Sequence, residues 1–200
     1  MTVLGTTKEL EEVLPGLHAA REAGRLVPFV GAGLSRPHCR SWLQFIDALY
    51  AEFGVGAASV PGGADPEGLY RVADRVAAWL RLLPAEERRR RIRAALHAPT
   101  FPALPPQAVV LASFSWPLVV TTNYDDVVPR ALRQQWREKQ PRLLGRSPQD
   151  CVQVLRSLDA LDAPIVWYIQ GHVCGDSAAS QSGEPTAPSL FDEILVGHQQ

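Results

Sequence analysis

The sequence contains no apolar run that approaches the ~20 residues needed by a transmembrane helix. Its first stretch, MTVLGTTKELEEVL, becomes charged within eight residues and lacks the uninterrupted apolar centre of a signal peptide. We therefore expect a cytoplasmic protein that does not associate with a membrane.

Cysteine is scarce, with three in 200 residues: Cys39, Cys151 and Cys174. They are far apart and odd in number, which argues against a disulfide framework. No C-x-x-C pair is present, and His38 beside Cys39 has no companion ligands at zinc spacing. We predict no bound metal and expect these two residues to line or cover a pocket.

The chain also has no excess of positive charge: 20 Lys and Arg face 21 Asp and Glu, a formal net charge of -1. The basic run Arg88–Arg91 looks like a nucleic-acid patch, but Glu86 and Glu87 adjoin it, which favours a solvated helix face or a subunit contact. We therefore expect no direct nucleic-acid binding. The length and the 46% hydrophobic content suit one globular domain over residues 1–200.

Helical patterns alternate with short apolar runs along the chain. Apolar side chains at helical spacing predict helices over residues 6–23, 42–53, 69–83, 84–98 and 127–140. Gly24 is expected to end the first helix, and Ser41 to cap the second. Apolar runs predict strands over residues 25–30, 117–126 and 163–173. This alternation is typical of an α/β fold with a parallel sheet, whose ligand crevice lies at the carboxyl ends of the strands.

The stretch VPFVGAGLSR breaks the first strand with Gly31 and Gly33. Such a turn suits a phosphate, because glycine permits positive φ and lets an anion approach backbone N–H groups without a Cβ in the way. The turn is not a complete G-x-G-x-x-G fingerprint, since Arg36 holds the third glycine position, and no Walker A G-K-[ST] is present. Taken alone, the motif is equally consistent with a tight turn that binds nothing.

The second strand ends in VVTTNYDD, in which the side chains of residues 121–125 can all hydrogen-bond. Asn123 and Asp125 lie two apart on an extended segment, so they point the same way and can grip a ribose or an amide. The alternative is that Asp125 or Asp126 caps the helix beginning at Val127, and for Asp126 we favour the cap.

Three separated pieces resemble the SIR2-like domains of bacterial anti-phage defence and signalling proteins, relatives of the sirtuins. The pieces are VPFVGAGLS followed by SW, then VVTTNYDD, then IVWYIQGHV. Family members usually read G-[AS]-G-x-S…W, T-T-N-Y-D and K-L-H-G. The resemblance covers roughly residues 25–175. It implies a Rossmann-like parallel sheet flanked by helices, with a helical subdomain inserted at about residues 55–105. Members typically cleave NAD+ between nicotinamide and ribose, and sirtuins proper deacylate lysine in the same pocket.

The resemblance also assigns roles to matching residues. Asn123 would hold the nicotinamide ribose or position a water beside its anomeric carbon, and Asp125 would order the nicotinamide pocket. Cleavage passes through a cation-like sugar, so the site mainly needs to orient the ring and shield the developing charge. The other residues implied in NAD+ binding are Gly31, Ala32, Gly33, Leu34, Ser35, Trp42, Thr121, Thr122 and Gly171, with the glycine turn cradling the pyrophosphate.

The chain departs from the family at Gln170, which stands where the general-base histidine belongs. Glutamine can hydrogen-bond a ribose hydroxyl but cannot take its proton. Three accounts stay open: natural loss of catalysis, a deliberate change that traps a ligand, or rescue by His172. We predict an NAD+ glycohydrolase, weakened or inactive at Gln170. The alternative is a non-catalytic NAD or ADP-ribose binding subunit. A protein deacylase is disfavoured, because the zinc-holding cysteine pairs and the histidine are missing.

Family members usually continue past the third motif, whereas this chain stops near residue 200. We therefore expect the domain to be truncated at its carboxyl-terminal side or to be completed by another chain. A sheet edge left open in this way needs covering. This favours a homo-oligomer or a complex with a partner defence protein.

Overall fold

A four-stranded parallel sheet lies at the centre of the computed structural model, which describes residues 7–54, 66–96, 103–138, 140–157, 163–173 and 196. Its strands are β1 (Phe29–Val30), β2 (Leu118–Thr121), β3 (Arg142–Leu144) and β4 (Ile165–Tyr168). The spatial order is β1-β2-β4-β3, and every pair of neighbours is parallel. The chain therefore has the predicted α/β architecture, with β2 and β4 inside the sheet and β1 and β3 at its edges.

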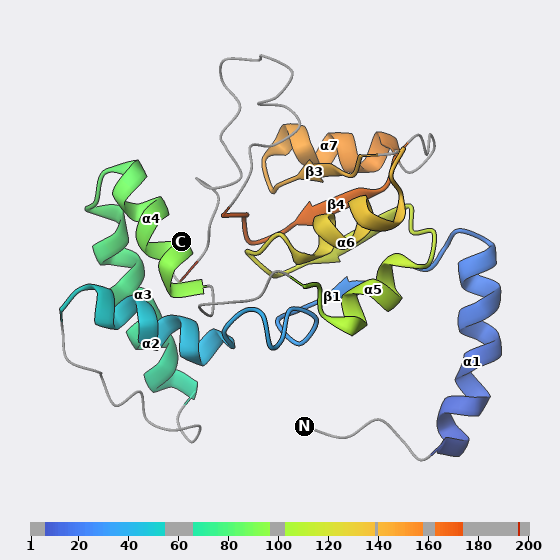
Figure 1. Cartoon of the computed structure of the whole chain (residues 1–200), viewed down its shortest axis with the longest axis horizontal. Coiled ribbons are helices and arrows are strands. Elements are labelled where there is room, and N and C mark those ends of the chain that lie inside the picture. The colour runs from blue at the N-terminus through green and yellow to red at the C-terminus, as the bar shows by residue number, and fades with distance from the viewer. Residues whose placement is uncertain are drawn as a thin grey trace.

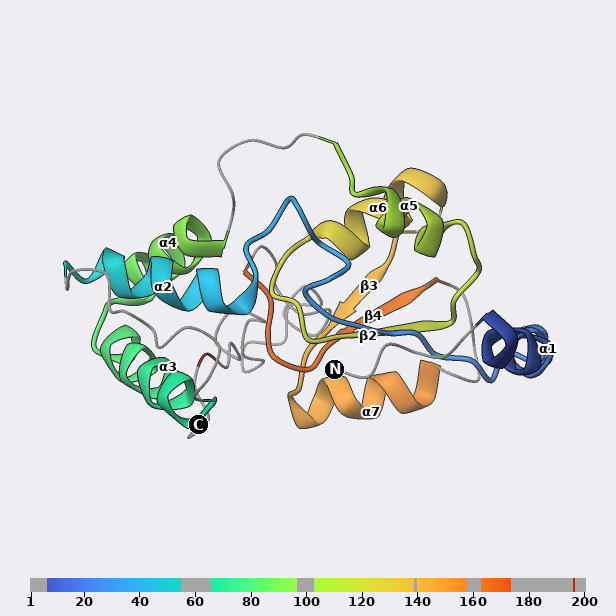
Figure 2. The same cartoon turned by 90° about the horizontal axis from the view of Figure 1, so that it is seen from below.

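Helices cover both faces of the sheet (Figure 2). On one face lie α5 (Pro106–Ala112) and α6 (Val127–Gln135), and on the other lies α7 (Pro148–Ser157). Successive side chains of β2 and β4 point to opposite faces of the sheet. Val119 and Val166 pack with α5 and α6, whereas Leu118 and Ile165 pack with Val154 of α7. Burial on both faces explains why these strands read as continuous apolar runs rather than as alternating ones.

Three further helices group together at the end of the sheet toward which the strands point (Figure 1). These are α2 (Trp42–Glu52), α3 (Pro66–Arg81) and α4 (Ala85–Leu96), and they share a core that includes Ile46, Val76 and Ile92. The remaining helix, α1 (Thr7–Glu22), lies at the opposite end of the molecule in both views. None of the helices in the described ranges is long and apolar enough to cross a membrane.

Local signals at two helix ends act as predicted. Gly24, at φ +66°, ends α1: its N–H donates to the Arg21 carbonyl, and the Arg25 N–H donates to the Ala20 carbonyl. This pair of bonds forms a Schellman motif, in which the residue after the helix, here Gly24, adopts a left-handed backbone conformation. Ser41 caps α2 through a reciprocal pair of hydrogen bonds with Gln44.

Other boundaries differ from the predictions. The first strand is reduced to two residues, since Pro28 offers no N–H to a ladder. The last strand ends at Tyr168 instead of residue 173, because Gly171 at φ +88° turns the chain. Both β3 and α5 were missed, as three and seven residues carry too little periodicity to be recognised. The segments 55–65 and 97–102, which bound the predicted insertion, lie outside the described residues.

The basic run is held by groups of the protein itself. Glu87 accepts hydrogen bonds from Arg90 and Arg91 at 2.7 to 2.8 Å. The Arg93 guanidinium donates to the Val173 carbonyl at 2.9 Å, which ties α4 to the segment that follows β4. This pairing fits the expected helix face better than a surface for a nucleic-acid backbone.

Two leucines test the core formed by α2, α3 and α4. Leu80 is 3% exposed, and Leu82, two residues on, is 83% exposed. Leu80→Ala should lower the free energy of unfolding by about 2–5 kcal/mol, because it leaves a cavity. Leu82→Ala, the matched control, should change it by no more than about 0.5 kcal/mol. Urea titrations followed by circular dichroism measure both, and equal losses would contradict the packing described.

Candidate functional site

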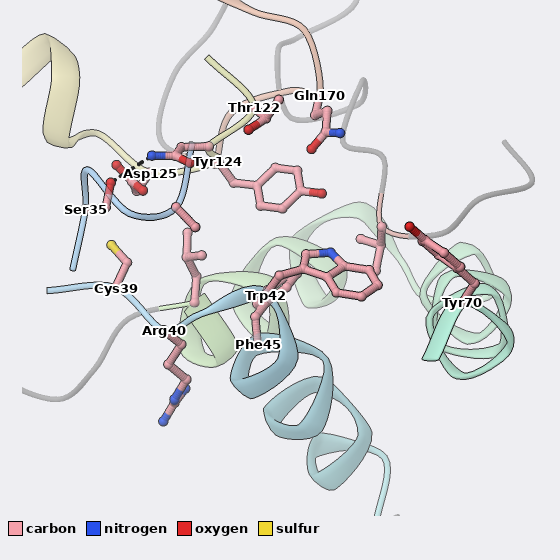
Figure 3. A pocket seen from close by; sticks show the side chains of 14 residues that line it. Ser35, Cys39, Arg40, Trp42, Phe45, Tyr70, Thr122, Tyr124, Asp125 and Gln170 are labelled. Carbon is pink, nitrogen blue, oxygen red and sulfur yellow. Dashed lines mark hydrogen bonds between the residues drawn. The ribbon is translucent and has the colours of Figure 1, made fainter. Parts of the chain in front are cut away.

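A cavity of about 420 Å³ opens at the carboxyl ends of β1, β2 and β4. It lies between the sheet and the α2–α4 group (Figure 3). The volume falls in the range of small-molecule sites. The sheet side contributes mainly polar side chains and the helical side mainly aromatic and aliphatic ones. Among the described residues, no three His, Cys, Asp or Glu side chains gather as metal ligands would.

The polar wall is organised around Asn123, which is 6% exposed. Its Nδ2 donates to the Gly31 carbonyl at 3.1 Å and to the Ser35 Oγ at 2.9 Å. Its backbone N–H donates to the Thr121 Oγ1 at 3.0 Å. Because a primary amide has only two N–H donors, both are used within the protein. Asn123 therefore offers a ligand its carbonyl oxygen, as an acceptor.

Asp125 continues this network and lies beside Ser35 (Figure 3). Its Oδ1 accepts from the Val127 N–H at 3.0 Å, and its backbone carbonyl accepts from the Tyr168 hydroxyl at 3.0 Å. Burial raises the pKa of this carboxyl. Hydrogen bonds from the Ser35 hydroxyl and the Val127 N–H oppose that rise. Asp125 thus serves both the cavity wall and the start of α6.

The favoured capping assignment for Asp126 is therefore wrong in one respect. Asp126 has the N-cap position of α6, but its side chain makes no capping hydrogen bond. It pairs instead with Arg130 at 3.7 Å, one turn along the same helix. The capping bond comes from Asp125, whose side chain is turned inward toward the helix start.

The glycine turn closes the sheet side of the cavity. The Leu34 N–H donates to the Gly31 carbonyl at 2.9 Å, and the Ser35 N–H donates to the Ala32 carbonyl at 3.3 Å. Neither glycine has positive φ, so that part of the prediction is wrong. A Cβ on Gly33 would meet no atom within 4 Å, and one on Gly31 only the Thr122 Oγ1 at 3.5 Å. The protein's own packing does not require glycine here, so the space is available to a ligand.

The opposite wall is aromatic. Trp42 of α2 and Tyr70 of α3 lie with ring centroids 6.0 Å apart, and Phe45 lies 5.6 Å from Tyr124. Burial raises the pKa of Tyr124, which keeps its hydroxyl protonated. Of these side chains, the sequence pointed to Trp42 through the family resemblance and to Tyr124 as one of the hydrogen-bonding residues 121–125. The three-residue spacing of Trp42 and Phe45 put both on one helix face, but no local signal identified Tyr70, because only the packing of α3 brings it to the cavity.

Several predicted residues line the cavity directly, and others support them from behind. Lining residues are Ala32, Ser35, Trp42, Thr122, Asn123, Asp125 and Gln170, together with Cys39, which is a free thiol. The side chain of Thr121 is fully buried beneath Asn123, and Leu34 packs into the core below α5 and α6. Gly31, Gly33 and Gly171 are not lining residues themselves, although Gly31 and Gly33 flank Ala32, which is one.

His172 is not brought into the cavity. It is 2% exposed, and its ring packs against Tyr168 with centroids 4.3 Å apart. Burial, with the nearby charges of Arg133 and Arg93, lowers the pKa of His172 to about 3. The left-handed Gly171 breaks the alternation that would have turned it to the same side as Gln170. Rescue of the missing base by His172 is therefore not supported by this arrangement.

Comparisons with known proteins identify no family for this chain. A scan against models of protein families finds no match, and a search of curated proteins finds no significantly similar sequence. The likeness to SIR2-like domains therefore depends on the three motifs.

The raised pKa of Asp125 predicts a pH dependence of stability. The folded protein holds this proton at pH values where the unfolded chain has lost it, so the free energy of unfolding falls as pH rises above the ordinary value of 3.8. Asp125→Asn cannot titrate, and it should gain stability relative to the parent as pH rises through that window. Asp126→Asn removes a negative charge that helps to raise the pKa of Asp125. In that variant the pKa of Asp125 should rise less, so the free energy of unfolding should fall over a narrower pH range. Urea titrations across the pH range measure this, and parallel profiles for all three proteins would refute it.

Proposed function

We propose that this chain binds NAD+ in the cavity and hydrolyses the bond between nicotinamide and ribose, as a SIR2-like NAD+ glycohydrolase. One observation supports this most: Asn123 bonds to Gly31 and Ser35, which lie 92 and 88 residues away in the chain. Two of the three motifs thus form one hydrogen-bonded wall. A shared site, rather than two unrelated turns, accounts for polar residues at both strand ends.

The two walls match the two chemistries of a nicotinamide riboside unit. The acceptor oxygen of Asn123 and the amide of Gln170 suit ribose hydroxyls. The rings of Trp42 and Tyr70 suit a planar heterocycle. The open backbone at Gly33 allows a pyrophosphate to approach N–H groups closely. The residues present therefore fit this substrate.

In this proposal the chain's residues mainly orient and shield. Asn123 holds the ribose through its oxygen while the nicotinamide leaves, and its own position is fixed by the Gly31 carbonyl and Ser35. Water adds to the anomeric carbon, and the products are nicotinamide, ADP-ribose and a proton. Gln170 cannot accept that proton. The loss of a general base typically costs about 10²–10⁴-fold in rate, so we expect slow turnover.

The absence of a general base at Gln170 supports a second candidate function, a non-catalytic subunit that binds NAD or ADP-ribose. Gln170 lines the cavity where a base would be needed, and His172 is buried against Tyr168 outside it. Binding without turnover would require a partner to read the bound state. An active hydrolase needs no such partner.

The proposal also covers architecture and assembly. We assign the sheet to the Rossmann-like class, with α3 and α4 in an inserted helical subdomain, because α2–α4 share a core of their own. We further propose that the protein acts in the cytoplasm, as a homo-oligomer or with a partner defence protein. The edge strand β1 supports an assembly, since Phe29 is 66% exposed there.

Restoring the histidine tests the catalytic assignment. Gln170→His should raise NAD+ hydrolysis by about 10²–10⁴-fold over the parent, because it supplies a base at the cavity wall. Asn123→Ala should abolish hydrolysis, and Gln134→His, on an exposed glutamine of α6, should match the parent. Nicotinamide release is followed by chromatography. If no variant turns over while calorimetry shows NAD+ binding, the binding subunit is the better proposal, and absence of binding would refute both.

The glycine turn has its own test. Gly33→Val should abolish NAD+ binding, because the side chain fills the space through which the pyrophosphate approaches. The fold should survive, since a Cβ at Gly33 meets nothing within 4 Å. Gly16→Val in α1 is the matched control, because a Cβ there also meets nothing within 4 Å and the site is remote. Calorimetry and circular dichroism measure both effects, and normal NAD+ binding by Gly33→Val would show that the turn does not hold the ligand.

A further inference from the structure

Gln107 on α5 connects a separate part of the chain to the glycine turn. Its Nε2 lies 2.6 Å from the Arg36 carbonyl, 3.1 Å from the Leu34 carbonyl and 3.4 Å from the Gly33 carbonyl. One side-chain amide therefore gathers three carbonyl groups of a turn more than 70 residues away. It lies outside the three sequence motifs and outside the cavity lining.

The effect of this contact reaches the cavity through peptide geometry. In a trans peptide the C=O and the N–H point in opposite directions. The carbonyls of Gly31 and Ala32 are tied back by the N–H groups of Leu34 and Ser35, so the N–H groups of Ala32 and Gly33 point the other way. Neither of these two N–H groups makes a hydrogen bond within the part of the chain that is described. Gln107 bonds to the carbonyls of Gly33 and Leu34, whose peptides carry the Leu34 and Ser35 N–H groups that tie back the Gly31 and Ala32 carbonyls. We call the carbonyls that Gln107 contacts the carbonyl end of the turn. The Ala32 and Gly33 N–H groups lie at its other end.

Side-chain charge does not replace those N–H groups. Arg40 is the cationic side chain among the described residues that line the cavity. Its Nη1 donates to the carbonyls of Ala94 and Ala95 at 3.0 and 2.7 Å, and its guanidinium is directed away from the cavity (Figure 3). A bound diphosphate must therefore be held largely by backbone N–H groups, whose direction depends on how the turn is fixed.

We propose that Gln107 is a positioning residue for the diphosphate of the ligand: by holding the carbonyl end of the turn, it keeps the Ala32 and Gly33 N–H groups aimed at the anion. This inference rests on the proposed function. The inference predicts different effects of Gln107 on two classes of ligand. Those with a diphosphate depend on Gln107, and those without one do not.

NAD+ and nicotinamide riboside provide the comparison, since the riboside lacks the diphosphate. Gln107→Leu removes the donor on an exposed helix position, and Gln107→Asn keeps the amide but shortens its reach. Both should weaken NAD+ binding about tenfold, as expected for the loss of one to two net hydrogen bonds. Riboside binding should change less than about twofold on the same scale. Gln135→Leu, on an exposed glutamine of α6, is the matched control.

Calorimetry gives both affinities, and steady-state hydrolysis by the Gln170→His protein with and without Gln107→Leu should show a raised KM at unchanged kcat. Equal losses for NAD+ and riboside would overturn the inference, because they would indicate a general effect on the fold. So would unchanged NAD+ binding by both Gln107 variants. If the parent protein binds NAD+ at no accessible concentration, the proposed function fails, and the inference fails with it.

Discussion

The side-chain amide of Asn123 holds the site together, because it joins two strand ends that the chain itself separates by about ninety residues. Both of its N–H donors are used, and the Ser35 that it binds is the next link to Asp125. Within a buried chain of this kind each bond polarises the next. Removing the amide would cost the Gly31 carbonyl and the Ser35 hydroxyl one hydrogen bond each, at about 0.5–1.5 kcal/mol per bond. The shape of the polar wall therefore follows from one residue.

The cavity owes its two characters to the different origins of its walls. Polar side chains gather at the strand ends because the parallel sheet brings the carboxyl ends of β1, β2 and β4 to one edge. The aromatic wall comes mainly from helices that pack on one another, and their shared core meets the sheet at Tyr124 and Val173. A ligand with a hydroxylated part and a flat apolar part fits between such walls. This contrast, more than the glycine motif alone, supports a nucleotide rather than a free anion.

Strong local patterns were readable from the sequence, and features set by tertiary packing were not. Apolar runs predicted the strands that lie inside the sheet, and Ser41 and Gly24 marked helix ends correctly. The direction of His172 depended on one dihedral angle at Gly171, which no pattern encodes. Tyr70 reaches the cavity, and Gln107 the glycine turn, only because their helices pack where they do. The expectation of positive φ at residues 31 and 33 was wrong, and what distinguishes Gly33 is the open space beside its backbone.

The segment after β4 is bound from both sides: the Val173 N–H donates to the Tyr124 carbonyl, and Arg93 of α4 donates to the Val173 carbonyl. The α2–α4 group is thus anchored to the segments that follow β2 and β4. Hinge motions between walls typically take microseconds to milliseconds, whereas rotamer changes of partly exposed side chains take picoseconds to nanoseconds. Because these two bonds join the walls, we expect a ligand to enter past the partly exposed rings of Trp42 and Tyr70 rather than by separation of the walls.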